Sequence, residues 1–223
     1  MSRHGILFDL DGTLADTAPD LVAVLNRMLL TAGRPPVPYA IARNEVSNGA
    51  LGLIRLGFGL APNAPVEPRT RQSFLDLYQR MGHINSRLFL SLSHIIYICS
   101  ELRAGWGIVT NKPAALTESL LEHLGIRTAV QALVCGDTLA QKKPHPAPLE
   151  HAAAELGLAC DSCVYLGDAE RDIRAGRAAG MKTLATSYGY IRPGESVATW
   201  HADAVADHPR KIHRMLQQIL TYS

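Results

Sequence analysis

Residues 6–14 read ILFDLDGTL, and this stretch decides the predicted fold. The apolar run 6–8 is typical of a buried strand, and Gly12-Thr13 indicates that the chain turns after it. Asp9 and Asp11 therefore lie at the carboxyl end of a strand, which is the edge where open α/β sheets bind ligands. Both side chains share one side only while the strand persists, so a turn between them directs them to different parts of one site.

The two carboxylates of this stretch suggest a metal ion and a phosphate ester. Neighbouring carboxylates repel each other unless a cation lies between them, and Mg²⁺ prefers oxygen ligands. An ionised Asp beside Mg²⁺ can also attack phosphorus and form an aspartyl-phosphate. Because an Asp-Gly turn after a strand is common in itself, the interpretation depends on the rest of the chain.

Length and composition narrow the class of protein. The 223 residues, 47% of them hydrophobic, suffice for one large α/β domain or for a core with a small second unit. The net charge is +2 and basic residues form no long run, so we expect no nucleic-acid partner.

No apolar stretch approaches the length of about 18 residues that spans a membrane, and we expect a cytoplasmic protein without a membrane partner. Four cysteines do not make a disulfide framework, and the Cys160-x-x-Cys163 pair has no second pair for zinc.

The pattern of the chain changes near residue 88. Residues 16–87 contain only helical patterns, separated by breaks rich in Gly, Pro and Asn. Strands and helices then alternate, which is typical of parallel βαβ units. We expect the later strands at residues 106–109, 132–135, 163–166, 182–186 and 204–206.

Polar residues follow three of these later strands, and parallel strands bring those ends to one edge of the sheet. Thr110 and Asn111 offer a hydroxyl, an amide and backbone N–H groups to phosphate oxygens. Lys143 can neutralise both a phosphate and an attacking carboxylate. Asp168 can complete a metal shell, and Asp172, one helical turn later, can orient water or Lys143. Each alone is explained as a helix cap or a solvated charge, but together they predict a phosphoryl-transfer site.

These four segments, 9–13, 110–111, 143–144 and 167–172, resemble the four motifs of the haloacid dehalogenase superfamily in order and separation. The phosphoglycolate phosphatase-like branch is the most similar. The resemblance implies an α/β fold: a Rossmann-like three-layer core with a mostly parallel sheet, formed by residues 1–15 and 88–223. Residues 16–87 resemble the small all-helical (C1-type) cap of that superfamily. Residues 88–92 depart from the Pro-Gly or Phe-x-Gly turn of relatives, so we expect the second cap hinge to be built differently.

The resemblance also implies roles for the motif residues. Asp9 is the expected nucleophile and a Mg²⁺ ligand, and Asp11 is the general acid/base that also lends its backbone carbonyl to the metal. Lys143 is the expected charge clamp. Asp168 is a metal ligand, supported by Asp172.

Substrate recognition is divided between the core and the cap. Thr110 and Asn111 are the expected phosphate binders by resemblance. In the cap, Asn48-Gly49 offers close backbone approach, and Arg43 and Arg55 can pair with a substrate carboxylate. A helix-connecting turn with solvated arginines explains the same residues equally well.

The expected function is a Mg²⁺-dependent phosphatase that acts on a small phosphorylated metabolite through an aspartyl-phosphate. Phosphoglycolate is the first candidate substrate, and N-acetylmuramic acid 6-phosphate or another sugar phosphate is the alternative. A phosphomutase would share Asp9, Asp11 and Lys143, whereas Asp11 argues against a dehalogenase. A binding protein without activity also remains open, because a fold does not fix function. We expect a monomer or a homodimer.

Overall fold

A six-stranded parallel sheet forms the centre of the molecule in the computed structural model, which describes residues 4–221. The strand order is β5-β4-β1-β6-β7-β8, and every neighbouring pair is parallel. The bounds are β1 His4–Phe8, β4 Ala104–Val109, β5 Ala132–Val134, β6 Cys163–Gly167, β7 Lys182–Thr186 and β8 Ala204–Ala206. Each predicted strand is therefore present, and the predicted α/β class with a mostly parallel sheet is confirmed.

Helices cover both faces of this sheet and make three layers. On β1 the side chains of Ile6 and Phe8 belong to the apolar cluster of one face, and Leu7 belongs to that of the other. Because both faces are covered, the strand is apolar along its length instead of alternating. The first face is covered by α5 (Leu92–Glu101), α6 (Ala114–His123) and α9 (Ile212–Thr221), and the second by α7 (Ala147–Glu155) and α8 (Glu170–Ala178).

The order of the strands places the site beside β1. From β1 the chain runs outward to β4 and β5, and it then returns to the other side of β1 for β6, β7 and β8. A crevice forms at the carboxyl ends of the strands where the winding direction reverses. Asp9 directly follows β1 at this point.

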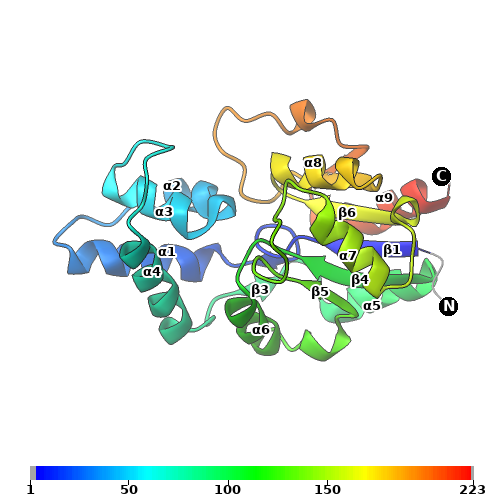
Figure 1. Ribbon diagram of the computed structural model, residues 1–223, viewed down its shortest axis with the longest axis horizontal. Helices are drawn as coiled ribbons and strands as arrows, with labels where there is room; N and C mark the ends of the chain where they lie inside the picture. The colour runs from blue at the N-terminus through cyan, green and yellow to red at the C-terminus, as the bar shows by residue number, and fades with distance from the viewer. Residues whose placement is uncertain (1–3, 222–223) are drawn as a thin grey trace.

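Four helices form a second unit with its own apolar cluster, at one end of the molecule (Figure 1). They are α1 (Ala18–Thr31), α2 (Tyr39–Ala42), α3 (Gly49–Phe58) and α4 (Pro68–Met81), with a 3₁₀ segment, Arg43–Asn48, between α2 and α3. α4 begins at Pro68, well before its first buried residue, Phe74; its first turns are polar, and Pro fits the start of a helix. The division of the chain into a cap of residues 16–87 and a core stays a prediction.

Two short strands, which the sequence analysis did not predict, join this helical unit to the sheet. β2 (Ala15–Asp16) pairs antiparallel with β3 (Arg87–Leu88). The Phe89 N–H extends the pairing by donating to the Leu14 carbonyl oxygen at 3.0 Å. Residues 88–92 thus need no glycine turn, because the second crossing is a paired strand. Among residues 4–221, no helix is long and apolar enough to cross a membrane.

Candidate active site

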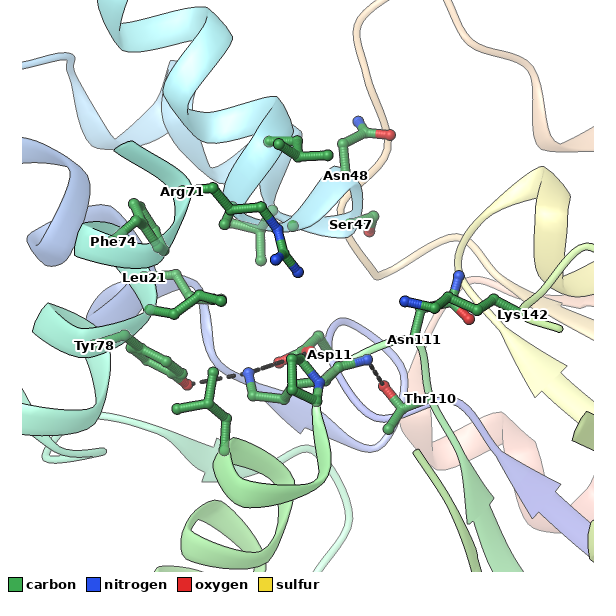
Figure 2. Close-up of a pocket in the computed structure, with 18 of the residues that line it drawn as sticks. Asp11, Leu21, Ser47, Asn48, Arg71, Phe74, Tyr78, Thr110, Asn111 and Lys142 are labelled. Carbon is green, nitrogen blue, oxygen red and sulfur yellow. Dashed lines mark hydrogen bonds and ion pairs between the residues drawn. The ribbon is translucent and has the colours of Figure 1, made fainter. Parts of the chain in front are cut away.

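A pocket of about 360 Å³ lies between the carboxyl edge of the sheet and the helical unit. Its floor includes Asp9, Asp11 and Thr110, which follow β1 and β4. Its roof comes from the 3₁₀ segment, α3 and α4, and Figure 2 shows Arg71 of α4 extending into the space between roof and floor. The predicted cap residues Asn48 and Gly49 lie in this roof. The structure therefore brings residues of the first two predicted motifs and part of the predicted cap site to one cavity, and the other two motifs lie beside it.

Lys143 connects two carboxylates beneath the pocket. Its buried Nζ lies 2.8 Å from Asp9 Oδ1 and 2.8 Å from Asp172 Oδ1. It also donates to the Tyr165 hydroxyl at 2.7 Å and to the Val109 carbonyl oxygen at 2.9 Å. Buried charges of this kind are stable only when they are paired and hydrogen-bonded. Lys143 is therefore fixed in position, with its charge directed at Asp9.

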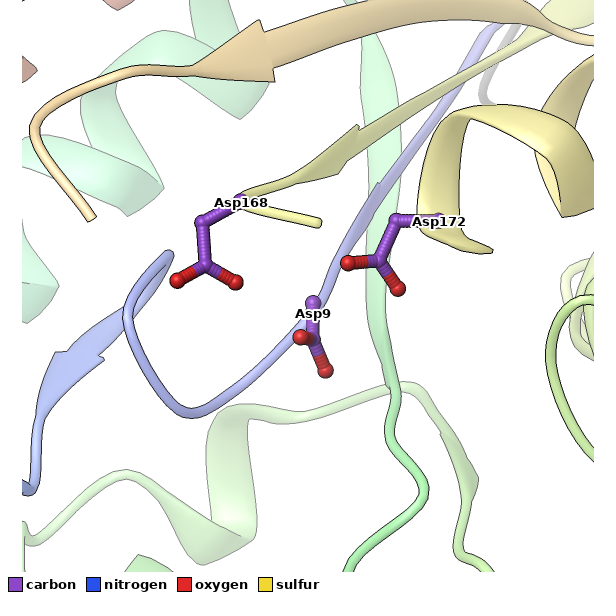
Figure 3. A group of neighbouring side chains, drawn as sticks. All are labelled: Asp9, Asp168 and Asp172. Carbon is purple, nitrogen blue, oxygen red and sulfur yellow. The ribbon is translucent and has the colours of Figure 1, made fainter. Parts of the chain in front are cut away.

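Asp168 completes a group of three buried carboxylates with Asp9 and Asp172 (Figure 3), whose nearest oxygens lie within 4.8 Å of one another. Oδ2 of Asp168 accepts hydrogen bonds from the Ser47 hydroxyl at 2.7 Å and from the Tyr190 N–H at 2.9 Å. Oδ1 of Asp168 is buried and has no partner among the described residues. A buried carboxylate oxygen without a partner is costly, and a cation beside it would remove that cost. The donor set is all oxygen, so it fits a hard divalent ion such as Mg²⁺.

The pKa values of these carboxyl groups show the same crowding. Burial raises the pKa of Asp9 to about 6, although the ammonium group of Lys143 opposes this shift. Burial, followed by the charges of Asp9 and Asp172, raises the pKa of Asp168 to about 7. An added positive charge at this group would lower both pKa values and keep Asp9 ionised.

Asp11 points to a different part of the pocket from Asp9, as a turn between them requires. Its Oδ1 accepts from the Thr17 hydroxyl at 2.6 Å and from Lys112 Nζ at 3.0 Å. Lys112 also donates to the Tyr78 hydroxyl of α4 at 3.2 Å, and dashed lines in Figure 2 mark its contacts with Tyr78 and Asp11. The side chain of Asp11 thus stands apart from the three-carboxylate group and lines the pocket.

Gly12 lies in the turn that follows Asp9 and Asp11. Its φ is +86°, a left-handed conformation that favours glycine. A Cβ at this position would lie 2.1 Å from Asp168 Oδ2. The glycine therefore permits both the turn and the close approach of Asp168.

Thr110 and Asn111 lie at the pocket but differ in how free their side chains are. The Thr110 hydroxyl accepts only from the Lys112 N–H at 3.2 Å among the described contacts, so its own proton is available. The Asn111 amide is paired twice with the backbone of Lys143, donating to its carbonyl oxygen at 3.0 Å and accepting from its N–H at 3.2 Å. The amide of Asn111 thus positions Lys143, and its role as a phosphate binder stays a prediction.

The two cap arginines predicted to bind substrate lie outside the pocket lining. Arg43 donates to the carbonyl oxygens of Gly189 at 3.0 Å and Tyr188 at 3.2 Å, and its guanidinium lies over the Tyr190 ring. Arg55 donates to the Ala64 carbonyl oxygen at 2.9 Å, within the helical unit. Arg43 therefore connects the helical unit to the core by hydrogen bonds, and Arg55 connects α3 to a loop of the helical unit.

Several residues at the site escaped the sequence analysis. They are Ser47, Arg71, Tyr78, Lys112, Tyr165, Arg171 and Tyr190. Lys112 follows Thr110-Asn111 directly, so its place at the same strand end was a usable signal. The hydroxyl of Tyr190 accepts from the backbone N–H groups of Thr17 and Ala18, a contact across the whole chain that no local pattern reveals.

Comparison with known proteins gives the class to which this fold and site belong. Residues 6–186 match the haloacid dehalogenase-like hydrolase family. The chain therefore belongs to that family, as its four motifs predicted.

Individual relatives of the chain within this family are phosphatases. N-acetylmuramic acid 6-phosphate phosphatase of Pseudomonas aeruginosa is 39% identical over 99% of this chain and 97% of its own length. Phosphoglycolate phosphatase of Xanthomonas campestris pv. campestris is 39% identical over 94% of each chain. Among solved structures, a predicted phosphoglycolate phosphatase of Haemophilus somnus has a TM-score of 0.81 at 26% identity, over 95% of this chain and 97% of its own. The expectation of a phosphoric monoester hydrolase on a Rossmann-like fold is confirmed.

Proposed function

We propose that this phosphatase hydrolyses a small carboxylated phosphomonoester through an aspartyl-phosphate on Asp9. The observation that carries the proposal is the position of Asp9, which lines the pocket while Lys143 and the unpaired oxygen of Asp168 lie beside it. Phosphoryl transfer depends mainly on positioning and on neutralising charge, and the site supplies both.

The proposed reaction assigns one step to each carboxylate that lines the pocket. A carboxylate oxygen of Asp9 forms a bond to phosphorus while the bond from phosphorus to the ester oxygen breaks. Asp11, in its protonated form, gives its proton to that departing oxygen. Asp11 then takes a proton from the water that attacks phosphorus, and this second step releases phosphate and restores Asp9. Thr110 donates its free hydroxyl proton to a phosphoryl oxygen, and Lys143 balances the negative charge.

The proposed metal site uses the side chains of Asp9 and Asp168 and the backbone carbonyl of Asp11. Asp172 is the supporting residue, because its Oδ1 is paired with Lys143 and its Oδ2 accepts from the Ala169 N–H at 3.1 Å. When bound, Mg²⁺ would neutralise charge on the phosphoryl group and draw it towards Asp9.

The helical unit is proposed to work as a cap that closes over the substrate. Two of its contacts with the core reach catalytic groups directly: Ser47 donates to Asp168, and Tyr78 accepts from Lys112. The pairing of β2 with β3 joins the two crossings side by side, so they can act as one hinge. A closed cap excludes bulk water from the charged groups around the phosphoryl group, which strengthens their electrostatic contacts, and an open cap releases the product and admits water.

The relatives support two substrates, phosphoglycolate and N-acetylmuramic acid 6-phosphate. Release of phosphate from a panel of phosphorylated metabolites in the presence of Mg²⁺ tests the proposal. A phosphomutase, the other reaction with these residues, would instead return an isomeric sugar phosphate and need a bisphosphate activator. The cytoplasmic location and the state of monomer or homodimer stay predictions.

Metal removal provides a direct prediction for this site. Excess chelator is expected to abolish phosphate release, and Mg²⁺ is expected to restore it, because Lys143 pairs with Asp9 and Asp172 but leaves Oδ1 of Asp168 without a recorded partner. Ca²⁺ is expected to restore little, since it takes more ligands at longer distances. Steady-state assays with each ion after chelation check this. Full activity in excess chelator would show that the carboxylates are not a metal site.

A further inference from the structure

Arg71 is a cation in the pocket for which the described contacts supply no partner. It lies on α4, it is half-buried, and Figure 2 shows its guanidinium directed into the cavity. The backbone N–H of Arg71 donates to the Glu67 carbonyl oxygen at the start of the helix, but none of the residues 4–221 is recorded as accepting a hydrogen bond or an ion pair from its side chain. The other basic residues of the lining differ: Lys112 is paired with Asp11, Arg171 donates to the Ser47 carbonyl oxygen at 2.7 Å, and Lys142 is exposed.

The wall beside Arg71 is apolar. It consists of Leu21 of α1, Phe74 and Leu75 of α4, and Leu116 of α6. Polar groups of Ser47 and Asn48 lie elsewhere in the lining, in the 3₁₀ segment of the roof. As far as residues 4–221 show, the pocket thus offers a half-buried, inward-directed cation without a recorded side-chain partner, an apolar wall and a polar roof, in addition to the proposed phosphoryl site on its floor.

The size and lining of the pocket favour the larger of the two candidate substrates. A volume of about 360 Å³ falls within the range of roughly 300–1,000 Å³ that encloses ligands of drug size. Phosphoglycolate has a single methylene group between its carboxylate and its ester oxygen, so it leaves the apolar wall and the roof without contacts. A sugar phosphate with a carboxylate side arm has hydroxyl, amide and alkyl groups for these surfaces.

We propose that Arg71 binds a carboxylate of the substrate, and that the substrate is a phosphorylated sugar with a carboxylate-bearing side arm. This inference rests on the proposed phosphatase function and names the substrate class of the same site. The planar guanidinium pairs with a carboxylate through two parallel hydrogen bonds, which fixes the orientation of the sugar as well as its charge. The alkyl part of the side arm then contacts the apolar wall of Leu21, Phe74, Leu75 and Leu116.

The test compares variants of Arg71 on matched substrates. Arg71→Gln removes the charge, and Arg71→Lys keeps it. Arg69→Gln changes an exposed arginine of the same helix outside the pocket and is the control. The substrates are N-acetylmuramic acid 6-phosphate, the same sugar phosphate without its lactyl ether, phosphoglycolate and an aryl phosphate. The measurement is kcat/KM for each variant with each substrate, and circular dichroism verifies the fold of every variant.

Arg71→Gln is expected to lower kcat/KM about ten- to a hundredfold on N-acetylmuramic acid 6-phosphate. This is the effect expected when a hydrogen bond between charged groups is lost. It is expected to leave the sugar phosphate without the lactyl ether and the aryl phosphate nearly unchanged, and Arg71→Lys is expected to recover part of the loss. Arg69→Gln should change nothing.

Three results would overturn the inference. Equal losses of kcat/KM on all substrates in Arg71→Gln would mean that Arg71 binds the phosphoryl group. If Arg71→Gln kept the wild-type preference for N-acetylmuramic acid 6-phosphate over the same sugar phosphate without its lactyl ether, Arg71 would bind no carboxylate. Turnover of phosphoglycolate as efficient as that of the carboxylated sugar would contradict the substrate class. In these cases the wild-type protein still hydrolyses the aryl phosphate, so the proposed function stands. Absence of turnover on every substrate would overturn the proposed function and the inference with it.

Discussion

Replacing Asp9 with asparagine is expected to reduce phosphate release below detection. The amide keeps the shape of the side chain but lacks the charge and the nucleophilic oxygen needed to form the aspartyl-phosphate. The fold should persist, because Asp9→Asn removes one of three crowded buried carboxylates and leaves Lys143 paired with Asp172. Steady-state assays with Mg²⁺, together with thermal unfolding, check this prediction.

The residual rate of Asp9→Asn distinguishes two reactions. If Asp9 were only a metal ligand, water would attack phosphorus directly, and a variant with a weaker ligand would keep part of its activity. Retention of a few per cent of the wild-type rate would therefore contradict covalent catalysis. Asp137→Asn is a suitable control, because this exposed carboxylate caps α6 by accepting from the Ala114 N–H and does not line the pocket.

Replacing Lys143 with methionine is expected to damage both activity and stability. The variant leaves Asp9, Asp172 and Asp168 buried without their cation, and breaking a buried ion pair costs about 3–5 kcal/mol. Loss of a preorganised charge also slows the chemical step by about 10²–10³-fold. Urea unfolding and kcat measure the two effects separately.

Lys142 provides the matched control for this prediction, since it is adjacent in sequence but exposed at the rim of the pocket. Lys142→Met should leave the free energy of unfolding almost unchanged. Mg²⁺ should raise the melting temperature of Lys143→Met, because a ligand that binds only the folded state stabilises it. Equal stability of the two variants would mean that Lys143 is not needed to balance the buried carboxylates.

The catalytic floor could be predicted from the sequence because parallel strands impose its geometry. The apolar runs 6–8 and 163–166 indicate buried strands, and such strands in one sheet end at the same edge. The carboxylates of Asp9 and Asp168 were therefore expected at one edge, and the pairing of β1 with β6 brings them into one group. The period of an α-helix likewise predicted that Asp172 can reach Lys143, and the structure places its Oδ1 2.8 Å from Lys143 Nζ.

The roof of the pocket could not be predicted in the same way. The apolar residues of α4 show which side of the helix packs, but no pattern tells which of its arginines borders a cavity made with distant elements. Arg71 lines the pocket, whereas Arg69, two residues earlier, is exposed. Arg43 shows the converse: a charged residue of the cap that faces the core, yet donates to backbone carbonyl groups there.

The hinge was also hidden from the sequence. β2 and β3 are each two residues long, and strands of that length have no detectable alternation. The pairing depends on Asp20, which accepts from the Asn85 N–H at 3.1 Å and from the Ser86 hydroxyl at 2.6 Å and so holds the returning segment beside the first. Such contacts between residues far apart in sequence become visible only in three dimensions.

The most direct test of covalent catalysis is to trap the phosphoryl group on Asp9. Asp11→Asn removes the proposed general acid/base, so an aryl phosphate, whose leaving group needs no proton, should phosphorylate the protein faster than water can remove the phosphoryl group. Mass spectrometry after acid quench should then find the mass of one phosphoryl group on the peptide that contains Asp9, and none in the Asp9→Asn/Asp11→Asn double variant. Phosphate release from the aryl phosphate by Asp11→Asn without any labelled protein, or a label on another residue, would contradict the account.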